Sequence, residues 1–313
     1  MEKFTTKRPE IKPSLEHVKG NTYCMVLSYA RIPLYMLGDG KAIMIDSGFP
    51  QSWENILWLL EKENLQITAV LTSHAHPDHL GNHRNLQKHF GAKLYMSDFA
   101  AMAYRTPMNQ TALGLGLVSY RMFREALGQP LRADHIIDPF SKTIDVEGTK
   151  FGVLYLPGHA AEHLGFITPD NVAYLGDAVL DENMVQRLRI PYCTCVEPDL
   201  ESKEAIAELH CDRYILAHNG VCDEIRPLAE QNRDSMLEKA RHLEKLCRDY
   251  QTLDQITLRF LLETGGNPDS YRTVHGARRN ISVFVEYLID TDRLEVRARN
   301  GVVEYKAKTP VSH

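Results

Sequence analysis

The stretch SHAHPDH at residues 73–79 decides how this sequence is interpreted. It places four side chains that can bind a metal ion, His74, His76, Asp78 and His79, within six positions. Core packing does not explain such a density of groups that Zn²⁺ and related ions accept as ligands. His74 and His76 alternate along an extended segment and share one side, whereas Asp78 and His79 follow the bend at the proline. Two differently directed pairs indicate two metal ions.

Further groups of the same chemistry occur where other apolar, strand-like segments end. They are Asp46 in IDSG, His159 in LPGHAAEHLGF, Asp177 in YLGDAV and His218 in ILAHNG. Taken singly, either histidine could belong to a turn or the core, and Asp177 could be a helix N-cap. Histidines elsewhere in the chain have no partner pattern and are interpreted as structural or surface groups, although His163 could support the ligands from behind.

Taken together, these motifs resemble those of the metallo-β-lactamase-fold hydrolases over roughly residues 20–222. The resemblance implies an α/β (α+β) protein, an αββα sandwich with metals at one edge of two facing sheets. It implies one metal bound by His74, His76 and His159, a second bound by Asp78, His79 and His218, and Asp177 bridging both. A site with an aspartate at the bridging position resembles the sites of glyoxalase II, lactonases and RNase Z, whereas classical β-lactamases have a cysteine at that position.

The expected cofactors are two divalent metal ions, zinc in the first place, with manganese or iron as alternatives. A water shared by two cations loses its proton near neutral pH, since one Zn²⁺ already lowers the pKa of a bound water to about 7. The resulting hydroxide would attack an ester, thioester or lactone. Asp78 is the candidate catalytic residue, which would orient the hydroxide or return a proton to the leaving group. Asp46 is expected to hydrogen-bond a ligand imidazole or the metal-binding loop.

The sequence predicts two domains, a metal-binding domain at 1–224 and a C-terminal module at 225–313. Asp39-Gly40 predicts a hairpin within an antiparallel meander over residues 23–47, and a helical insert is expected at about 97–134. This insert is rich in Met and aromatic residues, and either packs on the body or forms a lid with an apolar substrate wall. The module is predicted to be winged-helix-like, with helices at 226–250, 252–263 and 278–290 and strands at 293–298 and 302–307.

Charge and composition restrict the partners. The chain of 313 residues has a net charge of -5, which argues against a general nucleic-acid-binding surface. From residue 226 onward there are 15 Lys and Arg against 13 Asp and Glu, and the third helix carries Arg278 and Arg279 at its predicted start. We expect this module to serve in packing, homodimerisation or closure of the substrate pocket. A small-molecule substrate, acyl or otherwise hydrophobic, is the expected partner.

The location is predicted to be cytoplasmic. No apolar run approaches the ~18 residues of a membrane span, and the first residues lack the apolar stretch of a signal peptide. Six cysteines are few and unevenly spread, which favours reduced thiols over a disulfide framework. Cys193 and Cys195 form a Cys-x-Cys pair without a second matching cluster.

Three alternative functions stay open at this point. A persulfide dioxygenase would use the same loop with one iron bound by two histidines and an aspartate. A ribonuclease or phosphodiesterase would match a relative with a similar helical tail, but the acidic charge of the metal-binding domain argues against it. A non-catalytic protein could keep the metals for ligand binding or regulation, since a fold does not determine a function.

Overall fold

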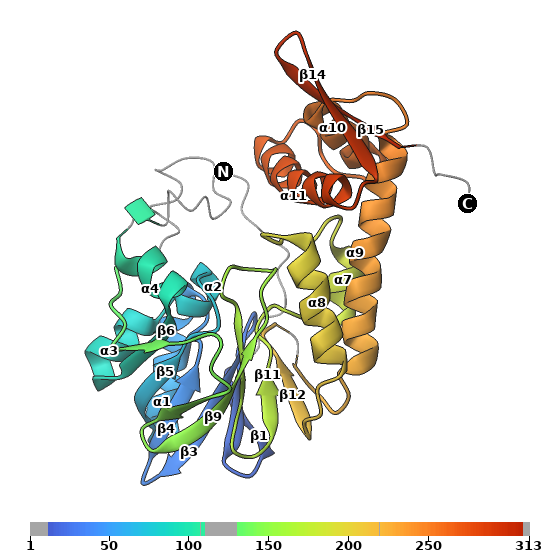
Figure 1. The fold of residues 1–313 in the computed structure, drawn as a ribbon. Coiled ribbons are helices and arrows are strands. Elements are labelled where there is room, and N and C mark those ends of the chain that lie inside the picture. The colour runs from blue at the N-terminus through green and yellow to red at the C-terminus, as the bar shows by residue number, and fades with distance from the viewer. Residues whose placement is uncertain (1–11, 107, 110–129, 219, 309–313) are drawn as a thin grey trace.

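The computed structural model describes residues 12–106, 108–109, 130–218 and 220–308. Two β-sheets lie face to face, and helices cover the outer face of each sheet (Figure 1). The predicted α/β class and αββα layering are therefore confirmed. Within the described residues, no helix has the length and apolar character that crossing a membrane requires.

The first sheet has its seven strands in chain order. They are β1 (Ser14–Lys19), β2 (Thr22–Val26), β3 (Arg31–Gly38), β4 (Lys41–Ile45), β5 (Gln66–Leu71), β6 (Lys93–Ser97) and β7 (His135–Ile137). Strands β2 to β4 form the predicted antiparallel meander, β1 adds a further antiparallel strand before it, and β4 to β7 run parallel to one another. Asp39 and Gly40 make the two-residue turn between β3 and β4, both with positive φ, as a type I′ hairpin requires.

The second sheet has the order β13-β12-β11-β10-β9-β8. Its strands are β8 (Thr143–Val146), β9 (Thr149–Tyr155), β10 (Leu164–Ile167), β11 (Val172–Tyr174), β12 (Arg213–Leu216) and β13 (Gly220–Cys222). Neighbours are antiparallel except β11 and β12, which are parallel. Strands β9, β11 and β12 therefore run in one direction and end at the same edge of the sheet.

The core explains why β4 is apolar from Ala42 to Ile45. Side chains alternate across a strand, so Ile43 and Ile45 face the second sheet and pack with Phe166, whereas Met44 packs under the helices of the outer layer. A strand covered on both faces needs apolar residues at every position. The edge that carries the candidate metal ligands is thus built on strands that the core holds on both sides.

Helices of the N-terminal part cover both sheets. Beside the first sheet lie the short 3₁₀ helix η1 (Pro50–Ser52) and α1 (Trp53–Lys62), α2 (Pro77–Leu80), α3 (His83–Phe90) and α4 (Asp98–Arg105). Beside the second sheet lie α7 (Glu182–Arg187), α8 (Val196–Ala207) and the first half of α9 (Arg226–Leu246) (Figure 1). Of the insert predicted at 97–134, α4 is described and buries Tyr104 completely, which supports the packing role for this part. Residues 107 and 110–129, with Tyr120, Met122 and Phe123, lie outside the described residues.

The C-terminal module contains the second half of α9, α10 (Leu253–Glu263), α11 (Tyr271–Asp290) and a hairpin of β14 (Leu294–Arg299) and β15 (Val302–Ala307). Leu243, Phe260, Phe284 and Leu294 form its core. The third helix begins at Tyr271 and not at residue 278 as predicted, because Ser270 caps it by accepting a hydrogen bond from the Thr273 N–H. Arg278 and Arg279 consequently lie within the helix and not at its start.

Candidate metal centre

The strand ends bring the predicted site residues to one edge of the sandwich. Asp46 follows β4, the loop with His74 follows β5, His159 follows β9, Asp177 follows β11 and His218 follows β12. These strands run in the same direction within each sheet, so their carboxyl ends meet there. All seven predicted ligand side chains come together in two groups that share Asp177.

The first group consists of His74, His76, His159 and Asp177, and one ligand atom from each lies within 4.8 Å of the others. His76 Nδ1 lies 2.9 Å from His74 Nε2 and 3.1 Å from His159 Nε2. Asp177 Oδ2 lies 3.6 Å from His159 Nε2. Three ring nitrogens and a carboxylate thus point at one place.

The second group consists of Asp78, His79, Asp177 and His218 within the same limit of 4.8 Å. Asp177 Oδ1 lies 3.1 Å from His218 Nε2, and its Oδ2 lies 3.5 Å from His79 Nε2. Asp78 Oδ2 lies 3.5 Å from His218 Nε2 and 3.7 Å from His79 Nε2. This group therefore has two carboxylates for two imidazoles.

Asp46 supports the loop from behind, as the sequence predicted. Its buried carboxylate accepts hydrogen bonds from the Ser73 N–H and hydroxyl, from Tyr174 Oη at 2.7 Å and from His79 Nδ1 at 2.7 Å. The Ser73 hydroxyl in turn lies 3.0 Å from His74 Nδ1. Because the Nδ1 atoms of both histidines face this network, their Nε2 atoms face the site.

Burial keeps the imidazoles of the first group neutral. It holds the pKa of His74 and His159 well below the usual value for histidine and lowers the pKa of His76 to about 4. Neutral imidazole is the form that binds a metal ion.

The carboxylates reverse this effect in the second group. Burial alone would lower the pKa of His79 and His218, but the charge of Asp177 raises the pKa of His79 well above its usual value and that of His218 to about 9. Burial would raise the pKa of Asp177, but His218 and His79 hold it well below its ordinary value. In this group, the positively charged imidazoles of His79 and His218 therefore pair with the negatively charged carboxylate of Asp177.

The donor set fits divalent metal ions. Within the described residues, the buried atoms His79 Nε2 and Asp177 Oδ1 have no hydrogen-bond partner, although ion-pair distances relate them to their neighbours. Leaving such atoms unsatisfied is costly unless another partner binds them. In the first group, one ring nitrogen from each of three histidines and a carboxylate oxygen lie within 4.8 Å of one another. A cation bound by imidazole and carboxylate satisfies both groups.

Two further residues at the site were not assigned to it by the sequence pattern. His163 is completely buried, its ring stacks on His74 with centroids 4.6 Å apart, and its Nε2 accepts a hydrogen bond from the Asp177 N–H at 3.2 Å. Its spacing from His159 was the one signal for this supporting position. Tyr192 lies with its ring centroid 5.0 Å from that of His76, and no motif indicated it.

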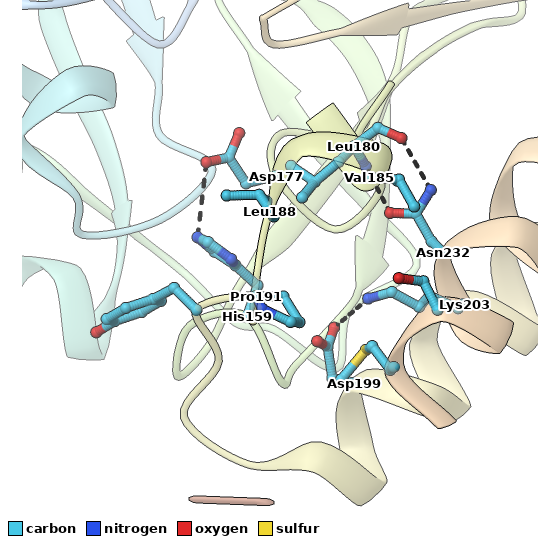
Figure 2. Close-up of a pocket in the computed structure, with 12 residues that line it drawn as sticks. His159, Asp177, Leu180, Val185, Leu188, Pro191, Asp199, Lys203 and Asn232 are labelled. Atoms are coloured by element: carbon cyan, nitrogen blue, oxygen red, sulfur yellow. Dashed lines mark hydrogen bonds and ion pairs between the residues drawn. The ribbon is translucent and has the colours of Figure 1, made fainter. Parts of the chain in front are cut away.

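A pocket lies beside His159 and Asp177, between the site and helices α7, α8 and α9. Figure 2 shows apolar residues on one side, among them Leu180, Val185 and Leu188. On another side, buried Lys203 pairs with Asp199 at 2.6 Å. The pocket thus borders both candidate ligand groups through the aspartate that they share.

Comparison with known proteins assigns the family. The model of the metallo-beta-lactamase superfamily matches residues 32–218, more than half of the chain, and the protein belongs to this superfamily. A crystal structure of a metallo-beta-lactamase family protein from Thermus thermophilus matches 95% of this chain and 99% of its own, with a TM-score of 0.69 at 18% sequence identity. The shared fold thus extends beyond residues 32–218.

Two curated relatives have names that describe activities. A hydroxyacylglutathione hydrolase of Haemophilus influenzae is 28% identical over 154 residues, which cover 49% of this chain and 68% of that protein. An atrochrysone carboxyl ACP thioesterase of Aspergillus chevalieri is 29% identical over 151 residues, or 47% of this chain and 39% of that protein. The match thus spans most of the bacterial enzyme and less than half of the fungal one.

Proposed function

We propose that this protein is a metal-dependent hydrolase that cleaves an ester, thioester or lactone with the help of two divalent metal ions, zinc in the first place. The observation that carries this proposal is the convergence of seven side chains into two groups that share Asp177. A mononuclear iron oxygenase needs two histidines and one aspartate. Because a second group of four candidate ligands is present beside the first, two metal ions and hydrolysis are favoured over one iron and the oxygenase reaction.

His74, His76 and His159 would hold one ion, Asp78, His79 and His218 the other, and Asp177 both. Bound there, the ions would supply a water that deprotonates near neutral pH and would stabilise negative charge on the oxygen of the group being cleaved.

The chain's own residues would orient the ligands and move the proton. Asp46 directs Nε2 of His79 into the site by accepting from its Nδ1, and the Tyr29 carbonyl oxygen accepts from His218 Nδ1 at 2.9 Å in the same way. The Asp78 side chain is 22% exposed, against 10% for Asp177, and is the carboxylate that solvent and substrate reach more easily. Asp78 would take up the proton of the attacking water on the carboxylate oxygen that does not bind the ion, and would return it to the leaving group.

An acyl compound is the proposed substrate. The names of the two relatives both describe the hydrolysis of an acyl substrate, on glutathione in one and on ACP in the other. Leu180, Val185 and Leu188 place apolar side chains beside the site, which favours a substrate with an apolar part. Residues 1–225 contain 21 Lys and Arg against 28 Asp and Glu, which disfavours a polyanion such as RNA.

Metal analysis combined with a substrate panel tests this proposal. Purified protein should contain two zinc or manganese ions per chain, and the metal-loaded protein should hydrolyse acyl thioesters of glutathione or pantetheine, simple esters or lactones. His159→Gln should abolish turnover, whereas His135→Gln, at an exposed histidine of β7, should not. If the protein instead contained one iron per chain and consumed a persulfide, it would be a persulfide dioxygenase and the proposed hydrolysis would be wrong. Fully loaded protein that cleaves nothing in the panel would indicate a non-catalytic role.

A further inference from the structure

Tyr192 connects the C-terminal module to two candidate metal ligands. Its ring centroid lies 5.0 Å from that of His76 and 5.5 Å from that of His159. The guanidinium carbon of Arg279, from α11, lies 3.7 Å from the centroid of the same tyrosine ring. A cation at this distance over an aromatic face is attracted to it and restricts the plane of the ring.

Hydrogen bonds hold the Arg279 side chain beside Tyr192. Its Nη1 donates to the Cys193 carbonyl oxygen at 2.7 Å and to Asn280 Oδ1 at 3.0 Å. In the part of the chain that the structure describes, no carboxylate forms an ion pair with it. The preceding residue, Arg278, points elsewhere on the helix and pairs with exposed Asp254 at 2.6 Å. Two adjacent arginines thus have different roles, of which one is directed to Tyr192.

The histidines that Tyr192 contacts are those whose second ring nitrogen has no hydrogen-bond acceptor. A metal-binding histidine almost always donates its other N–H to a carboxylate, a carbonyl or water, which fixes the ring. His74, His79 and His218 have such protein partners in Ser73, Asp46 and the Tyr29 carbonyl. For His76 Nε2 and His159 Nδ1, the described residues offer none. Packing against neighbouring rings restricts both imidazoles. Tyr192 is a neighbour that they share, as is His74, whose ring centroid lies 4.5 Å from that of His76 and 5.2 Å from that of His159.

We propose that Arg279 and Tyr192 are positioning residues, through which the C-terminal module holds His76 and His159 in the orientation that binds a metal ion. The guanidinium fixes the tyrosine ring, and the ring limits rotation of both imidazoles. This inference rests on the proposed function, because it assumes that these histidines bind metal. It gives the module a role at the first ligand group and none at the second.

Cobalt binding by the full-length protein tests the inference without an assay of activity. Metal-free wild type is titrated with Co²⁺, and d–d absorption and competition with a chelator report the affinity of each site. Arg279→Met and Tyr192→Ala should each weaken one of the two sites about tenfold and change its absorption band, leaving the other as in wild type. Tyr192→Phe, which keeps the ring, should bind both ions normally. Arg278→Met is the matched control on the same helix and should match wild type.

The outcomes separate the inference from the function on which it rests. If Arg279→Met and Tyr192→Ala bind both ions like wild type, or weaken both sites equally together with a lower melting temperature, the positioning role is overturned. Arg279→Lys keeps the charge but loses the planar group, and it provides the same measurement should Arg279→Met not fold. Wild type that binds no cobalt would overturn the proposed function itself.

Discussion

The two candidate ligand groups differ in what holds their histidines. In the second group, His79 and His218 each direct Nδ1 to an acceptor of the sandwich, the Asp46 carboxylate and the Tyr29 carbonyl. In the first group, His76 and His159 lie against Tyr192 without such an acceptor among the described residues. Both histidines of the second group are thus oriented by hydrogen bonds inside the β-sandwich. In the first group this holds for His74, whereas His76 and His159 pack against a later part of the chain.

The loop that carries His159 shows the same dependence on later residues. The Gly158 carbonyl oxygen accepts from the N–H and hydroxyl of Thr194 at 2.7 and 2.8 Å, and the Pro157 carbonyl oxygen accepts from the Ser202 hydroxyl at 2.6 Å. The segment before α8 and α8 itself therefore hold this ligand in place. We therefore expect that one half of the site can be disturbed without the other, and four substitutions test this.

Asp177→Ala should have the largest effect, because it removes the carboxylate that both groups share. We expect both metal ions to bind more weakly and hydrolysis to fall on the order of 10³-fold. Elemental analysis and kcat/KM measure these effects. Asp212→Ala, at an exposed aspartate paired with Lys19, is the control. Retention of both ions in Asp177→Ala would show that the two halves do not depend on a common ligand.

Gly158→Ala should disturb the half that carries His159. Gly158 has φ of +128°, and an added Cβ would lie 2.2 Å from Asp199 Cα, which is backbone that cannot move aside. Strain and overlap should lower the free energy of unfolding by about 3 kcal/mol. Gly148→Ala is the matched control, since its φ is +77° but nothing lies within 4 Å of the new atom. Its cost should be about 1 kcal/mol. Equal losses in denaturant unfolding would contradict the role of α8.

Asp46→Asn should act mainly on the second half. Asp46 Oδ2 accepts from Ser73, His79 and Tyr174, and an amide nitrogen at that position cannot accept from any of them. The affinity of the His79 site for Co²⁺ should fall about 10–100-fold, as for other partners of ligand histidines. Tyr174→Phe removes one donor and should leave metal affinity unchanged. If Asp46→Asn weakened Co²⁺ binding only at the site of His76 and His159, Asp46 would not be the residue that supports the second group.

Ser202→Ala should have the smallest effect of the four. The hydroxyl makes one hydrogen bond to the Pro157 carbonyl oxygen in a buried position, and its loss should lower the free energy of unfolding by about 1 kcal/mol. Metal affinity should stay within a few-fold of wild type, because Thr194 still holds Gly158. A loss as large as that of Gly158→Ala would mean that this single contact fixes the loop.

Much of the fold could be predicted because its signals are local. The alternation of apolar residues and the Asp39-Gly40 turn predicted the meander, and the strand-like segments at 293–298 and 302–307 predicted the two strands of the terminal hairpin. The start of α11 was misplaced because Gly276 interrupts the helical pattern. Helices α7 and α8 were not predicted; the apolar and polar residues of α8 are not segregated to faces, so that its periodicity carries little signal.

By itself, the sequence indicated the candidate ligands and their order along the chain. Metal binding needs particular residue types, and His74, His76, Asp78 and His79 occur too closely to have another explanation. What only the tertiary structure decided is the support of each ligand. Tyr192 and Arg279 are residue types with many uses, and their value here comes from the packing of α11 beside a loop almost ninety residues earlier. Such contacts leave no local pattern, because they depend on distances in space and not on spacing in the chain.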